Sequence, residues 1–126
     1  MSLRILVVED ESDLAEVTAA LLRKLGHSAV VAWSAESAMS IWKETNGAFD
    51  LMLIDFMLGA TSGAKLAVKL GKEHPGLPVI LMSGYSEAHL EMPSSKVKFL
   101  GKPFTPKQLQ EAIDSCVADS KRELRK

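Results

Sequence analysis

The 126-residue sequence has one cysteine, no excess of charge of either sign and no long hydrophobic run. The lone Cys116 excludes an intrachain disulfide framework and a cysteine-based metal cluster, and it suits a reducing compartment. The formal net charge is -1, so no basic field exists to hold nucleic acid or an anionic membrane. No apolar run approaches the roughly 18 residues of a membrane span, and no signal-peptide pattern opens the chain. We therefore expect a cytoplasmic domain without direct contact to nucleic acid or membrane.

Hydrophobic residues make up 47% of the chain, which at this length is enough for one substantial core. Short runs rich in Val, Ile and Leu recur along the sequence and predict β-strands. They cover residues 3–8, 28–33, 49–54, 77–82 and 96–100. Strands that are apolar throughout and alternate with helices are typical of a parallel sheet covered on both faces. Residues 1–126 are thus expected to form a single α/β domain with a doubly wound, five-stranded parallel sheet.

Three helices are expected between the first four strands. The first covers residues 13–26 and is stopped by Gly26. Its apolar face is expected to carry Leu14, Val17, Leu21 and Leu25. The second begins after Ser34 as its N-cap and is expected to bury Ala38, Ile41 and Trp42. The third follows Ser62 and runs to the "HPG" breaker at residues 74–76.

The last helix is the most clearly marked element. Thr105 is an N-cap, Pro106 occupies the first helical position and Gln108 completes a capping box. Its apolar stripe comprises Leu109, Ala112, Ile113, Cys116 and Val117, which makes Cys116 a core residue. Between the fourth and fifth strands, residues 86–96 have room for only one or two turns before Pro93, so a short or distorted fourth helix is expected there.

Polar side chains follow the predicted strands at the points where those strands end. Glu9 and Asp10 follow the first strand, Asp55 the third, Ser83 the fourth and Lys102 the fifth. If the strand order is 2-1-3-4-5, as in flavodoxin-like folds, the first and third strands are neighbours where the order reverses, and ligands bind there. Taken singly, such an acid commonly starts a helix, a serine forms a turn and a lysine stays solvated. Their presence at matching ends of adjacent strands instead predicts one pocket.

Three carboxylates in one pocket need a cation, since two like charges about 4 Å apart repel by roughly 4 kcal/mol at an effective dielectric near 20. The hard oxygens of Glu9, Asp10 and Asp55, with no histidine or cysteine nearby, suit Mg²⁺, which commonly binds carboxylates together with phosphate oxygens. This metal points to phosphoryl chemistry. Asp55 is the candidate nucleophile for an aspartyl phosphate. Lys102 and Ser83 would then bind the remaining phosphoryl oxygens.

Four motifs carry a resemblance to a known family. They are "LVVEDE" for the acidic pair, "DLMLIDFML" for the phosphoacceptor, "ILMSGYS" for a hydroxyl and "FLGKPFT" for the lysine. With these motifs, nearly the whole chain resembles the receiver domains of two-component response regulators. The resemblance implies Mg²⁺ bound by Asp10, Asp55 and the backbone carbonyl of Met57, with Glu9 assisting through water. It also suggests a cis peptide bond between Lys102 and Pro103, which the sequence alone leaves open.

Receivers of this kind take phosphate from a phosphohistidine on a partner histidine kinase or histidine phosphotransfer protein. The resemblance implies that Ser83 moves toward the new phosphoryl group while Phe99, at the position of an aromatic switch, turns inward. For Phe99, a simple core role is an equally open interpretation. Beyond its own phosphorylation and dephosphorylation, no enzyme activity is expected. Because Met57 offers no amide or acid to orient a water, autodephosphorylation is expected to be slow.

The chain also departs from the family pattern. Gly59 stands where the family usually has proline, which should loosen the loop beyond the acceptor. The stretch from Ser83 to Lys102 is short for a receiver, and it belongs to the usual output surface. Homodimerisation through that surface is an open alternative that the sequence does not support. The phrase "LMSGYSE" is reminiscent of receivers attached to hybrid sensor histidine kinases.

Three other functions are open alternatives at this point. A flavin binder would need a phosphate-cradling loop after the first strand, and "VVEDES" would repel phosphate without a metal. A phosphohydrolase with an aspartate nucleophile would want an acid at the position of Met57. A degenerate receiver would act as a phosphorylation-independent protein interaction module. Phosphodonor labelling with and without Mg²⁺ separates these functions.

Overall fold

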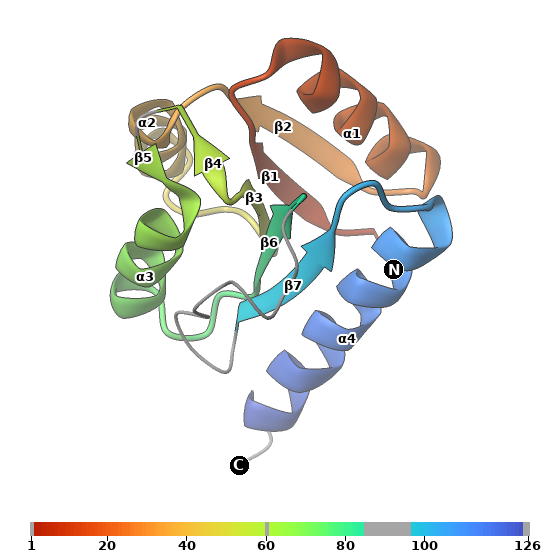
Figure 1. Ribbon diagram of the computed structural model, residues 1–126. Helices are drawn as coiled ribbons and strands as arrows, with labels where there is room; N and C mark the ends of the chain where they lie inside the picture. Colours follow the sequence, from red (N-terminus) through yellow and green to blue (C-terminus); the bar gives the residue numbers. More distant parts are fainter. Residues whose placement is uncertain (1, 60, 85–96, 125–126) are drawn as a thin grey trace.

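The computed structural model describes residues 2–59, 61–84 and 97–124. Its central element is a five-stranded sheet in which every pairing is parallel (Figure 1). The strands are β1 (Arg4–Val8), β2 (Ser28–Ala32), β3 (Leu51–Asp55), β6 (Val79–Ser83) and β7 (Val97–Gly101). Their spatial order is β2-β1-β3-β6-β7, which confirms the predicted order of the five apolar runs.

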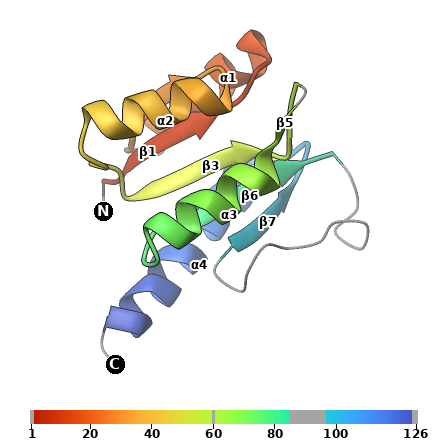
Figure 2. The same ribbon diagram turned by 90° about the vertical axis from the view of Figure 1, so that its left-hand side faces the viewer.

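Four helices pack against this sheet within the described residues. They are α1 (Ser12–Lys24), α2 (Ala35–Glu44), α3 (Gly63–Glu73) and α4 (Pro106–Leu124). Residues of α2 and α3 belong to the core on one face of the sheet, and residues of α1 and α4 belong to the core on the other (Figures 1 and 2). The sheet is therefore doubly wound, as predicted.

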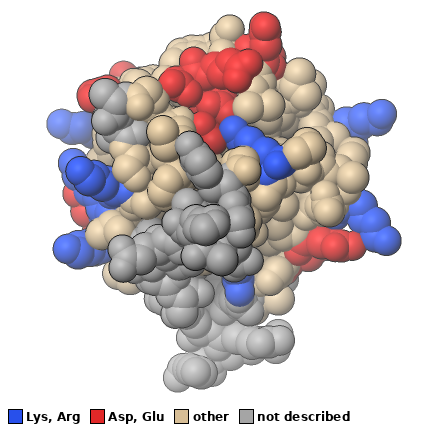
Figure 3. All heavy atoms as spheres, in the orientation of Figure 1, with Lys and Arg blue, Asp and Glu red and all other residues tan. Residues whose placement is uncertain are grey.

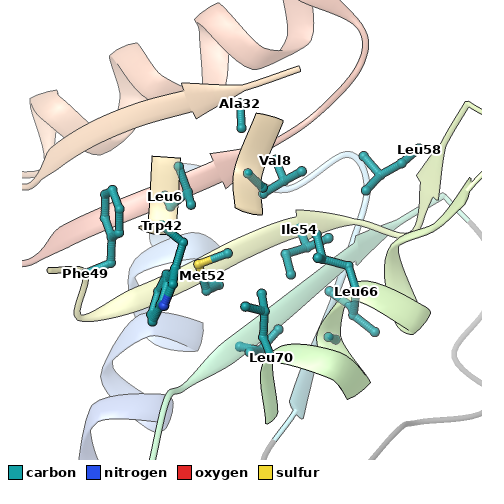
Figure 4. Close-up of a cluster of buried hydrophobic side chains, with 14 of the residues drawn as sticks. Leu6, Val8, Ala32, Trp42, Phe49, Met52, Ile54, Leu58, Leu66 and Leu70 are labelled. Carbon is teal, nitrogen blue, oxygen red and sulfur yellow. The ribbon is translucent and has the colours of Figure 1, made fainter. Parts of the chain in front are cut away.

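Consecutive strand residues enter opposite cores, because side chains alternate across a strand. In β3, Met52 and Ile54 join the core under α2 and α3 (Figure 4). Leu51 and Leu53 join the core under α1 and α4. A strand covered on both faces carries a continuous apolar run in place of alternating polar and apolar residues, as Leu51 to Ile54 do here. Cys116 is buried in the core under α1 and α4, as the apolar stripe of the last helix predicted.

The helix starts follow the predicted capping residues. The Ser34 hydroxyl accepts from the Ser37 amide at 3.0 Å, and the Ser62 hydroxyl accepts from the Ala64 amide at 3.1 Å. At the start of α4 the capping box is reciprocal. The Thr105 amide donates to Gln108 Oε1 at 2.9 Å, and the Gln108 amide donates to Thr105 Oγ1 at 3.1 Å.

The inward face of α1 differs from the predicted one. Val17 is 64% exposed, and Leu14, Leu21 and Leu25 are only partly buried. The buried residues are instead Ala15, Thr18, Ala19 and Leu22. The prediction is therefore wrong at Val17, whereas Leu21 and Leu25 pack against the core from its edge. The small alanines let the helix approach the sheet closely. In α2, Ala38 and Trp42 are buried as expected, and Ile41 is partly buried.

A short antiparallel pair beyond β3 was not predicted. It is formed by β4 (Met57–Leu58) and β5 (Thr61–Ser62). Gly59, which follows β4, has φ +58°, a left-handed conformation that proline cannot adopt. The glycine that replaces the family's usual proline therefore serves a turn.

The fourth helix expected within residues 86–96 lies outside the described residues. Among the residues that the structure describes, no helix combines the length and the apolar character that crossing a membrane requires.

Candidate functional site

The polar residues that follow the strands meet at the carboxyl edge of the sheet. Val8 of β1 pairs with Ile54 of β3, so Glu9 and Asp55 leave neighbouring strands at the same level. Lys102 follows β7, and its peptide bond to Pro103 is cis, as the resemblance suggested. Figure 3 shows acidic side chains gathered above this edge with a basic side chain beside them.

Lys102 connects two of the acidic residues directly. Its Nζ lies 3.0 Å from Glu9 Oε1 and 2.7 Å from Asp55 Oδ1. The side chains of Glu9 and Asp55 are 2% and 10% exposed, and that of Lys102 is 20% exposed. These are charge-assisted hydrogen bonds in a mostly desolvated site, where they are stronger than the same pairs in water. They hold the lysine head between the two carboxylates.

Asp10 completes a cluster of three carboxylates. Glu9, Asp10 and Asp55 each offer one oxygen, and these oxygens all lie within 4.8 Å of one another. Glu9 and Asp55 are buried, whereas Asp10 is exposed. One lysine charge does not balance three carboxylates, so the cluster retains an excess of negative charge at the carboxyl edge of the sheet. An additional cation would relieve that excess.

The surroundings shift the titration of two residues in this cluster. The pKa of Glu9 is raised from 4.5 to about 7, first because burial disfavours its charged form and also because Asp55 repels it, while the Lys102 hydrogen bond opposes the shift. For Lys102, burial alone lowers the pKa. Hydrogen bonds to Asp55 and Glu9 outweigh that effect and raise its pKa above 10.5. Lys102 is thus cationic throughout the neutral pH range.

The donor set of the cluster fits a hard divalent cation. All three side chains present carboxylate oxygens, which Mg²⁺ prefers over the softer nitrogen and sulfur donors. The exposed Asp10 carboxylate leaves the cluster accessible from solvent. Met57, the expected backbone ligand, begins β4 two residues beyond Asp55, and its side chain is 50% exposed.

The two expected switch residues lie on the neighbouring strands. Ser83 ends β6, is 2% exposed, and its backbone carbonyl accepts from the Lys102 amide at 2.7 Å. That bond links the ends of β6 and β7 beside the carboxylate cluster. Phe99 lies in β7 opposite Leu81 and is partly buried. A partly buried ring is compatible with both roles expected for Phe99, the aromatic switch and the core residue.

Gly63 was missed by the sequence reasoning. It is the first residue of α3, and its amide donates to the Phe56 carbonyl at 2.7 Å. A Cβ placed on Gly63 would overlap the carbonyl oxygen of Asp55 and lie 2.9 Å from its carbonyl carbon. The only sequence signal was a glycine directly after an N-cap serine, where most residues would serve equally well.

Comparison with known proteins gives a consistent result. The family model described as response regulator receiver domain matches residues 5–114. The chain is 32% identical to the sensor kinase CckA of Brucella abortus over 115 residues, which cover 89% of this chain and 12% of that protein. The chain spans less than half the length of the first curated relatives that it matches.

Solved structures agree with the sequence comparisons. The receiver domain of the hybrid histidine kinase CckA superposes with a TM-score of 0.76 at 34% identity, covering 90% of this chain and 97% of that one. The response regulator TrrA of Thermotoga maritima, solved in complex with Mg²⁺-BeF, has a TM-score of 0.79 at 27% identity, covering 90% and 97%.

Proposed function

The chain belongs to the response regulator receiver domain family, and from this premise we propose that it accepts a phosphoryl group on Asp55. The donor is a phosphohistidine on a histidine kinase or on a histidine phosphotransfer protein. The matched region, residues 5–114, supports treating residues 1–126 as a single receiver domain of a cytoplasmic phosphorelay. The likeness to the CckA receiver supports a donor of this class.

The proposed transfer uses groups that the pocket holds. An Asp55 carboxylate oxygen attacks phosphorus, the P–N bond to the donor imidazole breaks, and its electron pair remains on the ring nitrogen, which takes a proton. Lys102, with its Nζ 2.7 Å from Asp55 Oδ1, is positioned to bind an oxygen of the arriving group. The Ser83 hydroxyl, from the adjacent strand end, would bind another.

Mg²⁺ is the proposed cofactor. Asp10, Asp55 and the Met57 backbone carbonyl would hold it, and Glu9 would act through a water. When bound, the ion neutralises charge on the phosphoryl oxygens. The all-oxygen donor set supports this assignment. The Mg²⁺-BeF complex of TrrA supports it by analogy.

One observation carries the proposal: Lys102 is bonded to both Glu9 and Asp55 inside a cluster of three carboxylates. The direct test is labelling with the small phosphodonor phosphoramidate, read by intact mass, with and without Mg²⁺. We expect one phosphoryl group per chain in Mg²⁺ and none in Asp55→Asn. Asp13→Asn, an exposed acid in the first turn of α1, is the matched control. Unlabelled wild-type protein, or normal labelling of Asp55→Asn, contradicts the proposal.

Ser83 and Phe99 are the proposed switch residues. Acquisition of the phosphoryl group would draw the Ser83 hydroxyl toward that group, and the partly buried Phe99 ring would turn inward by a population shift. Nuclear magnetic resonance signals of both residues should therefore move on phosphorylation. Signals that stay in place for Phe99 would leave it as a core residue.

The alternative function is a phosphorylation-independent interaction module. It requires that the pocket be inert, and the arrangement of Lys102 between two buried carboxylates weighs against it. Partner binding that is equal for wild type and Asp55→Asn would favour this alternative. Homodimerisation is an open alternative, which sedimentation before and after labelling tests.

A further inference from the structure

The start of α3 lies against the backbone at the end of β3, where the proposed acceptor Asp55 stands. Beyond Asp55, Met57 pairs with Ser62 across β4 and β5, and the Gly63 amide then donates to the Phe56 carbonyl at 2.7 Å. This brings the first residue of α3 back against the end of β3. A Cβ on Gly63 would overlap the Asp55 carbonyl oxygen and lie 3.0 Å from Ile54 Cγ2.

Both contacts of that hypothetical Cβ are with groups that cannot move freely. The Asp55 carbonyl is backbone of a strand paired on both sides, with β1 and with β6. Ile54 is fully buried in the core under α2 and α3 (Figure 4). A side chain at Gly63 would therefore have to displace either the end of β3 or the start of α3.

We propose that Gly63 is a positioning residue for the phosphoryl-transfer site. Because it lacks a side chain, the start of α3 can lie directly against the Asp55 carbonyl, and this contact fixes the position of the Asp55 carboxylate. The inference rests on the proposed function. The Asp55 backbone and its carboxylate belong to the same residue, so a shift of the carbonyl changes the 2.7 Å contact with Lys102. The proposed ligand Met57 is two residues further along the same segment.

The test compares two glycines of the same helix. Gly63→Ala adds the obstructing methyl group, whereas Gly71→Ala adds one at a position with nothing within 4 Å. For each variant, the Mg²⁺ dissociation constant and the phosphoramidate labelling rate are measured well below the unfolding temperature and referred to the folded fraction. We expect Gly63→Ala to bind Mg²⁺ at least roughly tenfold more weakly. Its labelling should be roughly 10²-fold slower.

Gly71→Ala should match wild type in both measurements. If Gly63→Ala is only destabilised, with normal Mg²⁺ binding and normal labelling per folded molecule, Gly63 is merely structural and the proposal is wrong. Should wild type itself remain unlabelled, it is the proposed function that fails, so the two failures are distinguishable.

A third variant covers loss of folding in Gly63→Ala. The double variant Gly63→Ala/Gly71→Ala gains helix propensity at position 71, which offsets part of the destabilisation. Weak Mg²⁺ binding and slow labelling in the folded double variant support the proposal. Failure of both variants to fold in saturating Mg²⁺ contradicts it, because the glycine would then be needed for the fold itself.

Discussion

The Lys102 ammonium lies 2.7 Å from the Asp55 carboxylate, so the residue proposed to accept phosphate is already bonded to a cation. Lys102 Nζ also lies 3.0 Å from Glu9 Oε1, so the two carboxyl groups share one ammonium group. The lysine must then release part of this contact to bind the phosphoryl oxygens.

Removal of the lysine charge should destabilise the chain. In Lys102→Met, the buried Glu9 and Asp55 side chains lose the ammonium that bonds to both of them, and we expect a loss of about 2 kcal/mol in the free energy of unfolding. The side chain is 20% exposed, which places the effect below that of a fully buried pair. Urea denaturation without divalent cations measures it. Labelling by phosphoramidate should also fall.

Two controls sharpen this prediction. Lys69→Met, an exposed lysine of α3, should change stability by less than about 0.5 kcal/mol. Mg²⁺ should restore part of the stability that Lys102→Met loses, because the ion also neutralises the carboxylates. Equal stability of Lys102→Met and Lys69→Met would show that the ion pairs contribute nothing.

Asp10→Asn should have the opposite effect on the apo protein. Asp10 is exposed and lies within 4.8 Å of the other two carboxylates, so removal of its charge relieves repulsion. We expect a gain of about 0.5 kcal/mol in the free energy of unfolding at low salt. Stabilisation by Mg²⁺ should disappear in the same variant.

Asp13→Asn in the first turn of α1 is the control and should be slightly destabilised, since it loses a favourable helix-dipole contact. A loss of stability in Asp10→Asn would show that repulsion is not significant.

The sheet could be predicted from the sequence because strands buried on both faces carry continuous apolar runs, as Leu51 to Ile54 do in β3. Glu9, Asp55 and Lys102 could be placed because side chains that follow parallel strands share one edge of the sheet. The face of α1 could not, since Ala15 and Ala19 carry little hydrophobic signal and Val17 carries more.

The role of Gly63 and the β4–β5 pair were also beyond the sequence. Both depend on how closely two backbone segments approach each other after folding. That distance cannot be predicted from the residue types alone. Gly59 was noticed as a departure, but its positive φ is a property of the folded turn.

Stability of the apo protein should fall as pH rises from 5 to 8. Burial above all raises the pKa of Glu9 from 4.5 to about 7, so between these values the folded state binds a proton that the unfolded state has lost. That proton stabilises the fold below pH 4.5, and its contribution, on the order of 1 to 3 kcal/mol, is lost as pH passes 7. The pKa of Lys102 is raised, and the residue stays charged in the folded and the unfolded state over this range. It therefore adds nothing to the pH dependence of the free energy of unfolding.

Urea denaturation at pH 5, 6, 7 and 8 without divalent cations measures the slope. Glu9→Gln cannot ionise at position 9 and should show a flatter profile. Glu11→Gln, an exposed neighbour, should keep the wild-type profile. A wild-type stability that rises over this range would show that Glu9 is ionised in the folded state.

The phosphorylated protein should lose its phosphoryl group slowly, and residue 57 should control the rate. Hydrolysis needs a water oriented toward the acyl phosphate, and the Met57 thioether is a poor hydrogen-bonding group. Because Met57 is 50% exposed, its side chain can be replaced without opening a core cavity. Met57→Asn supplies an amide that can hold the water, so its decay in Mg²⁺ should be faster than that of wild type. Met57→Leu keeps the shape without an amide and should decay at the wild-type rate. The decay is followed by intact mass after removal of the phosphodonor, and a wild-type lifetime of seconds would contradict this account of the water.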